Sequence, residues 1–319
     1  MSKEILSIKS IKRTYRYVVP KTSLFYFKRV LPLSVLSTNL PDYSYLVGKI
    51  MGDGHIDKRY SIKFIAGDTS QLDLIYNYLT KKFFIPFNRM KISKKVSTKG
   101  LSYVLHVNYS PFGRILSQLG APVGNKTMNA FSVPKWILIN NNTKRLFLQA
   151  LLEDELTTIK IEKKFHANSP VLKLIKHPNH VNSLREFLYE IKKMINDLGI
   201  STSEISKSIV TENGKISMYL RLNQNKENII KFSQNIGFRF NVIKKNKLKD
   251  CVKVLRKTRY NRKVSVNMGK LQEYINRGYS IRRISQLMKV NRSSIHSRML
   301  MLKFNTKKNL LKKMECDTL

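Results

Sequence analysis

Two short segments place an acidic residue at the same position. LVGKIMGDG (46–54) and LQALLEDEL (148–156) both have an acid in their eighth position, Asp53 in one and Glu155 in the other. Both segments are patterned as helices, so each carboxylate lies near a C-terminus, where the helix dipole carries partial negative charge. Two carboxylates so placed become favourable when divalent cations bridge them, and their oxygens suit Mg²⁺ or Mn²⁺. A metal-activated water beside a basic surface is typical of phosphodiester hydrolysis.

The same two segments predict close helix packing. Gly48 and Gly52 lie four residues apart on one helix face, at a cost of about 1 kcal/mol each relative to alanine. That cost is tolerable where another backbone comes very close. Ala150 and Asp154 have the same spacing in the second segment. The two helices are therefore expected to pair and to bring their C-terminal ends together.

One such match alone would be weak, because an acid followed by glycine, as in Asp53-Gly54, is common in turns. Two matches, offset by about 100 residues in a chain poor in acids, favour a functional pair. The nearby acids Asp57, Glu153 and Asp154 are interpreted as solvated or structural carboxylates.

The charge of the chain indicates a polyanionic partner. The 319 residues include 60 Lys or Arg and 20 Asp or Glu, a formal charge of +40. This excludes an ordinary neutral enzyme of small neutral metabolites. Between Asp73 and Glu153, 79 consecutive residues contain no acid and twelve basic residues, a single-sign pattern typical of a phosphate-binding face. A hydrophobic content of 42% excludes a wholly disordered basic tail.

We expect an intracellular protein that is not secreted. No apolar run reaches the roughly 18 residues of a transmembrane helix, and the N-terminus lacks the apolar core of a secretory signal. The two cysteines, Cys251 and Cys316, form no disulfide framework and no zinc site, which fits a reducing compartment.

The middle of the chain repeats one order of elements, offset by about 100 residues. Residue periodicity predicts helix, strands, helix, hairpin and helix in each copy. The hairpins turn at Lys99-Gly100 and Asn213-Gly214, and Asn-Gly is the strongest short-range hairpin signal. The predicted elements are 46–54, 60–68, 69–84, 89–110 and 112–120, then 148–156, 157–165, 170–177, 180–199, 205–223 and 226–237. This order indicates a duplicated α+β unit.

The paired segments resemble the motifs of LAGLIDADG homing endonucleases of the single-chain, two-motif type. In the second segment, Ala150 and Leu156 stand where the family motif has glycines. Residues 119–137 also resemble the family's segment between its two halves, and the resemblance covers about residues 43–257. The residues that agree with the motif are Leu46, Gly48, Ile50, Asp53 and Gly54 in the first segment, and Leu148, Leu151 and Glu155 in the second.

The resemblance implies a fold and an activity. Members have two pseudo-symmetric αββαββα halves, whose saddle-shaped antiparallel sheets enter the DNA major groove. One carboxylate from each motif helix binds divalent metal, here Asp53 and Glu155, and both strands of a long asymmetric site are cut. Members also place a lysine near the central water network. Lys126 matches the first such lysine, and Lys244 or Lys245 the second, with the choice left open.

Further candidate DNA contacts lie on the two predicted hairpins and in the C-terminal segment, which resembles a helix-turn-helix. Ser280 can cap its first helix, and after a turn near 289–291 a second helix follows. In helix-turn-helix proteins this second helix enters the major groove; a plain helical hairpin is the alternative. The expected contacts are Lys91, Lys94, Lys95 and Lys207 on the hairpins, and Arg292, Ser293, Ser294 and Arg298 on the second helix.

Four parts of the chain are predicted. They are a basic N-terminal extension (1–41), a first half (42–140), a second half (141–257), and a basic linker with the helix-turn-helix and tail (258–319). The extension could contact nucleic acid or pack on the core. Splicing signals of inteins are absent, so a freestanding or intron-encoded reading frame is expected.

The sequence thus predicts a monomeric, Mg²⁺-dependent, site-specific endonuclease of double-stranded DNA that acts in intron homing. One alternative is a DNA-binding regulator, since one bacterial regulator family joins a non-cleaving LAGLIDADG fold to a helix-turn-helix. The presence of both Asp53 and Glu155 argues against it, because clustered carboxylates facing DNA do not help a pure binder. The other alternative is a maturase that binds intron RNA, an activity that could coexist with cleavage.

Overall fold

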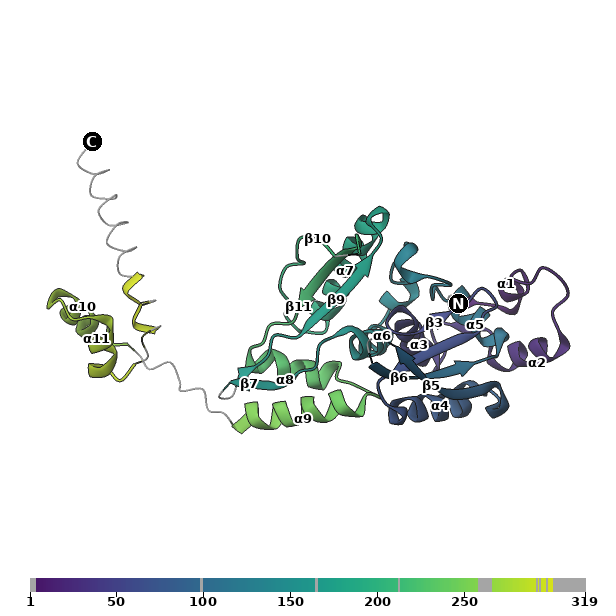
Figure 1. Cartoon of the computed structure of the whole chain (residues 1–319), viewed down its shortest axis with the longest axis horizontal. Coiled ribbons are helices and arrows are strands. Elements are labelled where there is room, and N and C mark those ends of the chain that lie inside the picture. The colour runs from purple at the N-terminus through teal and green to yellow at the C-terminus, as the bar shows by residue number, and fades with distance from the viewer. Residues whose placement is uncertain are drawn as a thin grey trace. The chain divides into compact units, whose positions relative to one another are not determined.

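The computed structural model describes residues 4–97, 100–163, 166–211, 213–257, 266–290, 292, 294–296 and 298–300 (Figure 1). The chain divides into two compact units, Met1–Lys257 and Thr258–Leu319. Within the described ranges, no helix combines the length and the apolar character needed to cross a membrane. The predicted turn residue Lys99, the predicted DNA contact Ser293, and Cys316 lie outside the described residues.

The first half of the larger unit has the element order that the sequence predicts. Its four strands form an antiparallel sheet in the order β3-β4-β6-β5, with Ile62 of β4 opposite Val107 of β6. Helix α4 packs on one face of this sheet, against β4, β5 and β6. The elements are α3 (Leu40–Met51), β3 (His55–Ile56), β4 (Ile62–Ala66), α4 (Thr69–Phe83), β5 (Met90–Ser97), β6 (Gly100–Val107) and α5 (Ser110–Gln118).

The second half repeats this order with one additional short strand pair. Strands β10, β11 and β9 form an antiparallel sheet, and Leu156 bridges Leu172 of β9 at the place that β3 has beside β4. The elements are α6 (Asn141–Glu155), β7 (Ile161–Lys163), β8 (His166–Ala167), β9 (Val171–Lys176), α7 (Val181–Asp197), β10 (Ile209–Val210), β11 (Ile216–Arg221) and α8 (Lys226–Asn235). The predicted α+β class with antiparallel sheets is confirmed. The αββαββα order is modified here, because β7 and β8 pair with each other and, among the described residues, with no other strand.

Local sequence explains where these helices begin. Asp68 caps α4 by accepting the Gln71 N–H at 3.1 Å, and Asn140 caps α6 by accepting the Thr143 N–H at 2.9 Å. Such side-chain caps satisfy backbone donors that have no partner within the helix. The predicted start of the helix at 69 is confirmed by the first of these contacts.

The sheet of the first half has one apolar and one polar face. Along β4, Ile62 and Phe64 are buried while Lys63 between them is only partly buried, as strand alternation requires. Lys63 lies opposite His106 of β6, and His106 lies opposite Lys91 of β5. A row of basic side chains therefore crosses the face that α4 does not cover.

Further elements lie outside the repeat. Strand β1 pairs with β2, and Ile11 and Phe27 are fully buried in the main core, so the described part of residues 4–41 packs on the first half. These elements are β1 (Glu4–Leu6), α1 (Ile8–Lys12), α2 (Lys21–Val30), β2 (Leu33–Ser34), α9 (Val242–Lys257) and the 3₁₀ helices η1 (Phe87–Arg89), η2 (Lys126–Met128), η3 (Lys135–Leu138) and η4 (Pro178–His180).

The smaller unit has its own core. Helices α10 (Met268–Asn276) and α11 (Ile281–Leu287) are followed by helical residues 292, 294–296 and 298–300. Ser280 caps α11 by accepting the Arg283 N–H at 3.3 Å, as predicted. Lys289 takes a left-handed conformation (φ 51°) in the turn before the last helix. The buried residues that join the three helices are Leu271, Ile284, Val290 and Ile295.

The two motif helices, α3 and α6, pack directly against each other. A Cβ atom at Gly48 would lie 2.5 Å from the Phe147 carbonyl oxygen and 3.1 Å from Ala150 Cβ. Ser44 Oγ also donates across the pair to the Thr143 carbonyl oxygen at 3.0 Å. The predicted close approach of these helices is therefore confirmed, and Gly48 is the residue that permits it.

We expect Gly48→Ala to destabilise the larger unit, although alanine is the better helix former. The added methyl group would overlap the Phe147 carbonyl oxygen, and overpacking of this kind costs about 1–3 kcal/mol. Urea unfolding measures the loss. Gly67→Ala is the matched control, because a Cβ atom there meets nothing within 4 Å. Equal unfolding midpoints for the two variants would contradict the prediction.

Candidate active site

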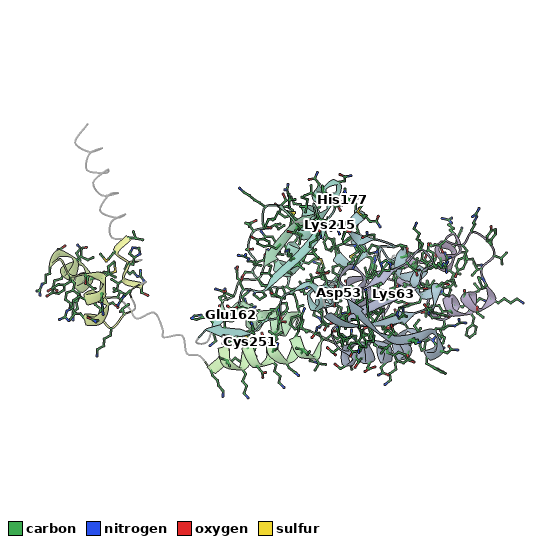
Figure 2. The ribbon with its side chains drawn as sticks, in the orientation of Figure 1. Asp53, Lys63, Glu162, His177, Lys215 and Cys251 are labelled. Carbon is green, nitrogen blue, oxygen red and sulfur yellow. The ribbon has the colours of Figure 1, made fainter. Side chains whose placement is uncertain are left out.

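Asp53 and Glu155 lie at the C-terminal ends of the paired helices. Asp53 follows Gly52, the C-cap residue of α3, and is exposed; Glu155 is the last residue of α6 and is partly buried. Burial, and then the charge of Asp53, raise the pKa of Glu155 to about 7, as expected of a carboxyl close to another carboxylate. Figure 2 shows Asp53 at the junction of the two halves. The structure thus brings the two predicted carboxylates together.

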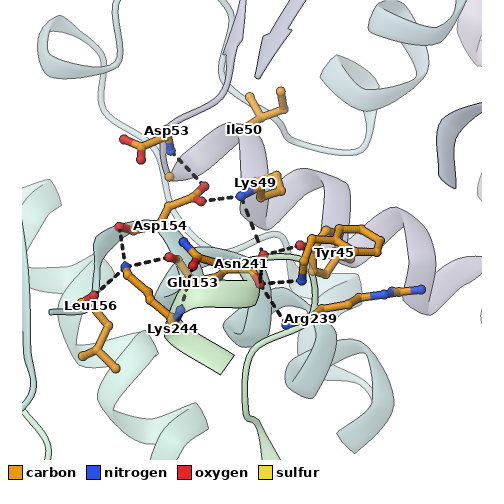
Figure 3. Close-up of polar contacts among 12 residues, drawn as sticks. Tyr45, Lys49, Ile50, Asp53, Glu153, Asp154, Leu156, Arg239, Asn241 and Lys244 are labelled. Atoms are coloured by element: carbon orange, nitrogen blue, oxygen red, sulfur yellow. Dashed lines mark hydrogen bonds and ion pairs between the residues drawn. The ribbon is translucent and has the colours of Figure 1, made fainter. Parts of the chain in front are cut away.

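The backbone of Asp53 is held by the opposite helix. Its N–H donates to Oδ2 of Asp154 at 3.1 Å (Figure 3). A Cβ atom at Gly52 would lie 2.7 Å from the same oxygen, so the approach requires glycine. Asp154 therefore fixes the backbone of Asp53 just after the end of α3.

A lysine donates to the C-terminal carbonyl groups of α3. Nζ of Lys126 donates to the carbonyl oxygen of Ile50 at 3.0 Å and to that of Gly52. Burial lowers the pKa of Lys126, and the charges of Glu155 and Asp53 oppose this shift. The predicted Lys126 thus lies beside both carboxylates, where its charge offsets the negative end of the helix dipole.

A second lysine has the same place at the end of α6, and it is Lys244. Its Nζ donates to the carbonyl oxygens of Glu153 and Leu156, both at 2.7 Å, and of Asp154 at 3.2 Å (Figure 3). Burial lowers its pKa. Lys245, the other candidate from the sequence, is exposed. Adjacent residues on α9 point in different directions, so only one of the two can reach the helix end.

Glu153 is a structural carboxylate that the protein satisfies completely. Its side chain is 0% exposed. Oε1 accepts the backbone N–H groups of Arg239, Phe240 and Asn241 at 2.8, 2.6 and 2.7 Å, and Oε2 accepts the Tyr45 hydroxyl at 2.5 Å (Figure 3). Successive backbone N–H groups form a concave anion site of this kind. Glu153 therefore ties the segment before α9 to the helix pair and positions Lys244.

Asp154 is likewise buried and paired. It forms an ion pair with Lys49 of α3, whose Nζ also lies 3.7 Å from Oε2 of Glu153, and the side chains of Lys49 and Asp154 are each 2% exposed. Burial raises the pKa of Asp154 to about 6, and the charge of Lys49 opposes this rise. Burial acts to lower the pKa of Lys49, but the two acids outweigh it and raise the pKa above its usual value. Lys49 therefore stays charged.

The four acids at the helix ends thus fall into two classes. Glu153 and Asp154 are engaged by described donors, whereas no hydrogen bond or ion pair from any described residue engages the carboxylates of Asp53 and Glu155. Glu153 and Asp154, which the sequence analysis interprets as solvated or structural carboxylates, are buried and paired and so belong to the structural kind. Two carboxylates remain that can bind something other than protein.

A third lysine, Lys176 of β9, holds the segment that carries Lys126. Its Nζ donates to the carbonyl oxygens of Lys126 and Asn129 and lies 3.5 Å from the Phe131 ring centroid. Burial lowers its pKa to about 8. A cavity of about 210 Å³ lies between this lysine and Glu155. Lys176 therefore positions Lys126 from the sheet of the second half.

The predicted DNA contacts fall on several surfaces. Lys91 and Lys95 share the exposed face of β5, Lys94 points to the other face, and Lys207 is exposed before β10. In the smaller unit, Arg292 is exposed, and Ser294 and Arg298 are partly buried on the last described helix. These residues belong to the smaller unit, which is described by itself.

Sequence reasoning missed the buried partners Tyr45, Lys49 and Lys176. A signal for Lys49 was present, since it interrupts the apolar run of a helix, where a buried charge requires a partner. No comparable signal existed for Lys176, because it is one of many lysines in a basic strand. The backbone donors at 239–241 carry no sequence signal, as any residue supplies an N–H.

We expect Lys49→Met to destabilise the larger unit by about 3–5 kcal/mol, because Asp154 would remain buried without its charge partner. The Lys49→Met/Asp154→Asn double variant should recover much of this loss, since neither charge then remains. Urea unfolding of the wild type, both single variants and the double variant gives the coupling free energy. A coupling near zero would show that the ion pair does not hold the helices.

Comparison with known proteins gives distant likenesses. No family model matches the chain. It is 26% identical over 251 residues to the replication factor C small subunit of Methanocaldococcus jannaschii and 26% identical over 239 residues to the tRNA-splicing ligase RtcB of Pyrococcus furiosus. These matches cover 74% and 69% of this chain but only 13% and 23% of the relatives. The chain therefore spans a small part of the length of the curated relatives it matches.

Two solved structures are also similar. The structure of I-DmoI in complex with DNA and Ca matches at 13% identity and a TM-score of 0.42, over 65% of this chain and 97% of that chain. The homing endonuclease I-WcaI bound to its DNA recognition sequence matches at 13% identity and a TM-score of 0.45, over 75% of this chain and 97% of that chain. At this identity and these TM-scores, neither structure by itself assigns an activity to this chain.

Proposed function

We propose that this chain is a divalent-metal-dependent, site-specific endonuclease that cuts both strands of a DNA duplex, as the LAGLIDADG resemblance implies. One observation carries the proposal. Asp53 and Glu155, at the joined ends of two equivalent helices, are the carboxylates that the described protein groups leave unengaged, while Glu153 and Asp154 beside them are fully engaged. We further propose that the chain acts as an intracellular monomer.

The donor set fits Mg²⁺ or Mn²⁺. Mg²⁺ in proteins is commonly held by one or two carboxylates, with waters and substrate phosphates completing its shell. Asp53 is exposed, and Glu155 has a pKa raised by burial and by Asp53, so a cation between them would relieve their repulsion. When bound, the metal ion would activate a water and stabilise charge on the leaving oxygen.

The lysines of this chain would stabilise charge at the reacting phosphate. Lys126 and Lys244 hold the carbonyl ends of α3 and α6 and keep these partial negative charges away from the phosphodiester. An ammonium has three donors, so Lys126, which donates to two carbonyl oxygens, has one N–H left for a phosphate oxygen. The donors of Lys244 are directed at the carbonyl oxygens of Glu153, Asp154 and Leu156, so Lys244 would act through its charge. Lys176 and Glu153 act as positioning residues, because each holds the segment that carries one of these lysines.

The two sheets would bind the DNA on either side of the cut. Lys63 and Lys91 lie on the exposed face of the first sheet, and Lys173 and Arg221 lie on strands β9 and β11 of the second. Multiple phosphate contacts of this kind make binding strongly salt-dependent. The residues of the two faces differ, so a target with two different halves is expected.

We include the smaller unit in this proposal as a helix-turn-helix that binds the same DNA. What supports it is the order of three helices around one small core, with Arg292 exposed at the start of the last helix. A left-handed residue, Lys289, stands in the turn. In helix-turn-helix proteins the N-terminal residues of the last helix contact base edges.

The curated relatives are consistent with a module that has its own activity. A replication factor subunit, a tRNA-splicing ligase and an RNA polymerase subunit each match more than half of this chain but less than a quarter of their own length. Their names denote different activities, so those activities do not explain what the matched part of this chain does. We propose that this part is an endonuclease that serves intron homing.

The test of the proposal is cleavage of a randomised duplex library in Mg²⁺ and Mn²⁺, with Ca²⁺ for binding without cleavage. We expect the wild type to cut both strands of one long sequence. Asp53→Asn and Glu155→Gln should lower cleavage by at least about 10²-fold, since even the groups behind metal ligands contribute about 10–100-fold. Both variants should keep or gain affinity, because each removes a negative charge near the DNA phosphates.

Other outcomes would support the alternatives. A wild type that selects one duplex sequence but cuts it in neither metal would be a DNA-binding regulator. A wild type that selects no duplex but binds structured intron RNA would be a maturase. If both Asp53→Asn and Glu155→Gln still cut the duplex at the wild-type rate, the two-carboxylate mechanism is wrong.

We expect Lys244→Met to lower the cleavage rate by about 10²–10³-fold, the loss typical for one group that stabilises charge in the transition state. Lys245→Met is the matched control, because it removes the same charge from the next residue of α9, on the exposed side. The control should change cleavage by less than about threefold and reduce only the salt dependence of binding. Single-turnover rates on the selected duplex give both values. A larger loss of cleavage rate for Lys245→Met than for Lys244→Met would show that Lys244 is not the central lysine.

A further inference from the structure

The N-terminal extension exposes a strongly basic surface. Residues 1–41 contain one acid, Glu4, and residues 5–41 contain none, so little within the extension offsets its positive charge. Every Lys and Arg within this range is exposed. These residues are Lys9, Lys12, Arg13, Arg16, Lys21, Lys28 and Arg29.

This surface belongs to a folded element and not to a loose arm. Ile11 and Phe27 are buried, and the buried Tyr26 hydroxyl donates to the Phe83 carbonyl oxygen of α4 at 3.0 Å. The segment between α1 and α2 is exposed at its tip, where Tyr17 is 80% and Val18 is 91% exposed. The extension therefore presents its charges at fixed positions on the first half.

Arg114 of α5 anchors the start of this segment. Its Nη1 donates to the Thr14 carbonyl oxygen at 2.6 Å. Its guanidinium carbon lies 4.0 Å from the centroid of the Tyr15 ring and 4.2 Å from that of the Tyr60 ring. Arg114 is thus stacked with two tyrosines, one from the extension and one from the turn between β3 and β4.

That turn is itself fixed and basic. Oδ1 of Asp57 accepts the N–H groups of Arg59 at 2.8 Å and Ser61 at 2.9 Å. Tyr60 has a left-handed conformation (φ 64°), and its carbonyl oxygen approaches Gly113 so closely that a Cβ atom there would lie 2.0 Å away. Lys58 and Arg59 are exposed on this turn.

The turn joins the extension to the polar face of the first sheet. It connects directly to β4, whose Lys63 lies in the row of basic residues with His106 and Lys91. The stack of Tyr60, Arg114 and Tyr15 then leads to Arg13 and Arg16. Exposed basic residues therefore stand on the sheet face (Lys91), on the turn (Lys58 and Arg59) and on the extension (Arg13 and Arg16).

We infer that Arg13, Arg16, Lys58 and Arg59 form a second DNA-contacting surface. It binds duplex phosphates beyond the end of the first sheet at which the turn between β3 and β4 lies. The inference rests on the proposed function, because it requires that the sheet face binds the duplex. Arginine side chains on a fixed platform match phosphates in geometry and charge, and Asp57, the acid of the turn, is already engaged by the N–H groups of Arg59 and Ser61. The target bound by this chain is thus longer on the side of the first half than the sheet alone would reach.

The test compares the full-length double variant Arg13→Gln/Arg16→Gln with a charge-matched control, Lys81→Gln/Lys82→Gln. The control residues are exposed on α4, which covers the opposite face of the sheet. Affinity for the selected duplex is measured in Ca²⁺ across a salt series. Loss of two phosphate contacts should reduce the slope of log affinity against log salt by about 1.8. The ratio of wild-type affinity to variant affinity should then be about tenfold larger at 50 mM than at 200 mM salt.

A hydroxyl-radical footprint gives a second readout. The arginine variant should lose protection at one end of the target only, the same end at which Lys91→Gln weakens protection. The control should keep the wild-type slope and footprint, and thermal melting should show that both variants are folded. An arginine variant with the slope and footprint of the control would overturn the inference and leave this surface to a partner such as an acidic protein. Equal losses in both variants would also overturn it, since they would reflect total charge.

Failure of the proposed function gives a different result. If the wild type binds no duplex, both the proposed function and this inference are wrong. A wild type that binds and cuts its target, with no change in the arginine variant, would remove only the second surface.

Discussion

The close approach of α3 and α6 is the constraint on which the rest of the larger unit depends. Gly48 lets the two backbones touch, and the same approach places both helix C-termini side by side. Helix C-termini carry partial negative charge, and four acids stand there as well. Such an arrangement is stable only if cations are built in. Lys126 and Lys244 each hold one helix end, and Lys49 neutralises the buried Asp154. These lysines thus lie where the helix pair creates negative potential, and Asp53 and Glu155 remain available to an external ligand.

The helix pair is pseudo-symmetric in backbone but not in charge. Lys49 of α3 has its counterpart in Leu151 of α6, and Gly52 has its counterpart in Asp154. Asp154 occupies the space that Gly52 leaves, and it holds both Lys49 and the Asp53 N–H. A pairing of either helix with its own copy would put two lysines or two acids together. Burial of like charges is costly, so this interface favours the union of two different halves. Under the proposed function, that union would in turn favour a target with two different half-sites.

Periodicity and turn chemistry were sufficient to predict the repeat, because each copy buries one face of its helices and sheet. The start of α4 at Asp68 and the cap of α11 at Ser280 are local features, and both are confirmed. Position within the motif was enough to name Asp53 and Glu155, which the structure brings together. The choice between Lys244 and Lys245 depended instead on the direction of α9, which is set when Glu153 accepts three backbone N–H groups. Contacts of this type carry no residue preference, so no sequence pattern could reveal them.

Fixed geometry also distinguishes the basic surfaces of this chain from a merely positive exterior. A charge of +40 attracts any polyanion, but a basic residue on a disordered segment loses backbone freedom each time it contacts a phosphate. Here the charges stand on ordered elements: Lys63 and Lys91 on paired strands, and Arg13 and Arg16 beside the stack of Tyr15, Arg114 and Tyr60. Ordering completed during folding is not repeated on binding. In the DNA complex that we propose, the free energy of each phosphate contact would therefore help to hold the duplex in one register, with a single phosphodiester of each strand at the carboxylate pair.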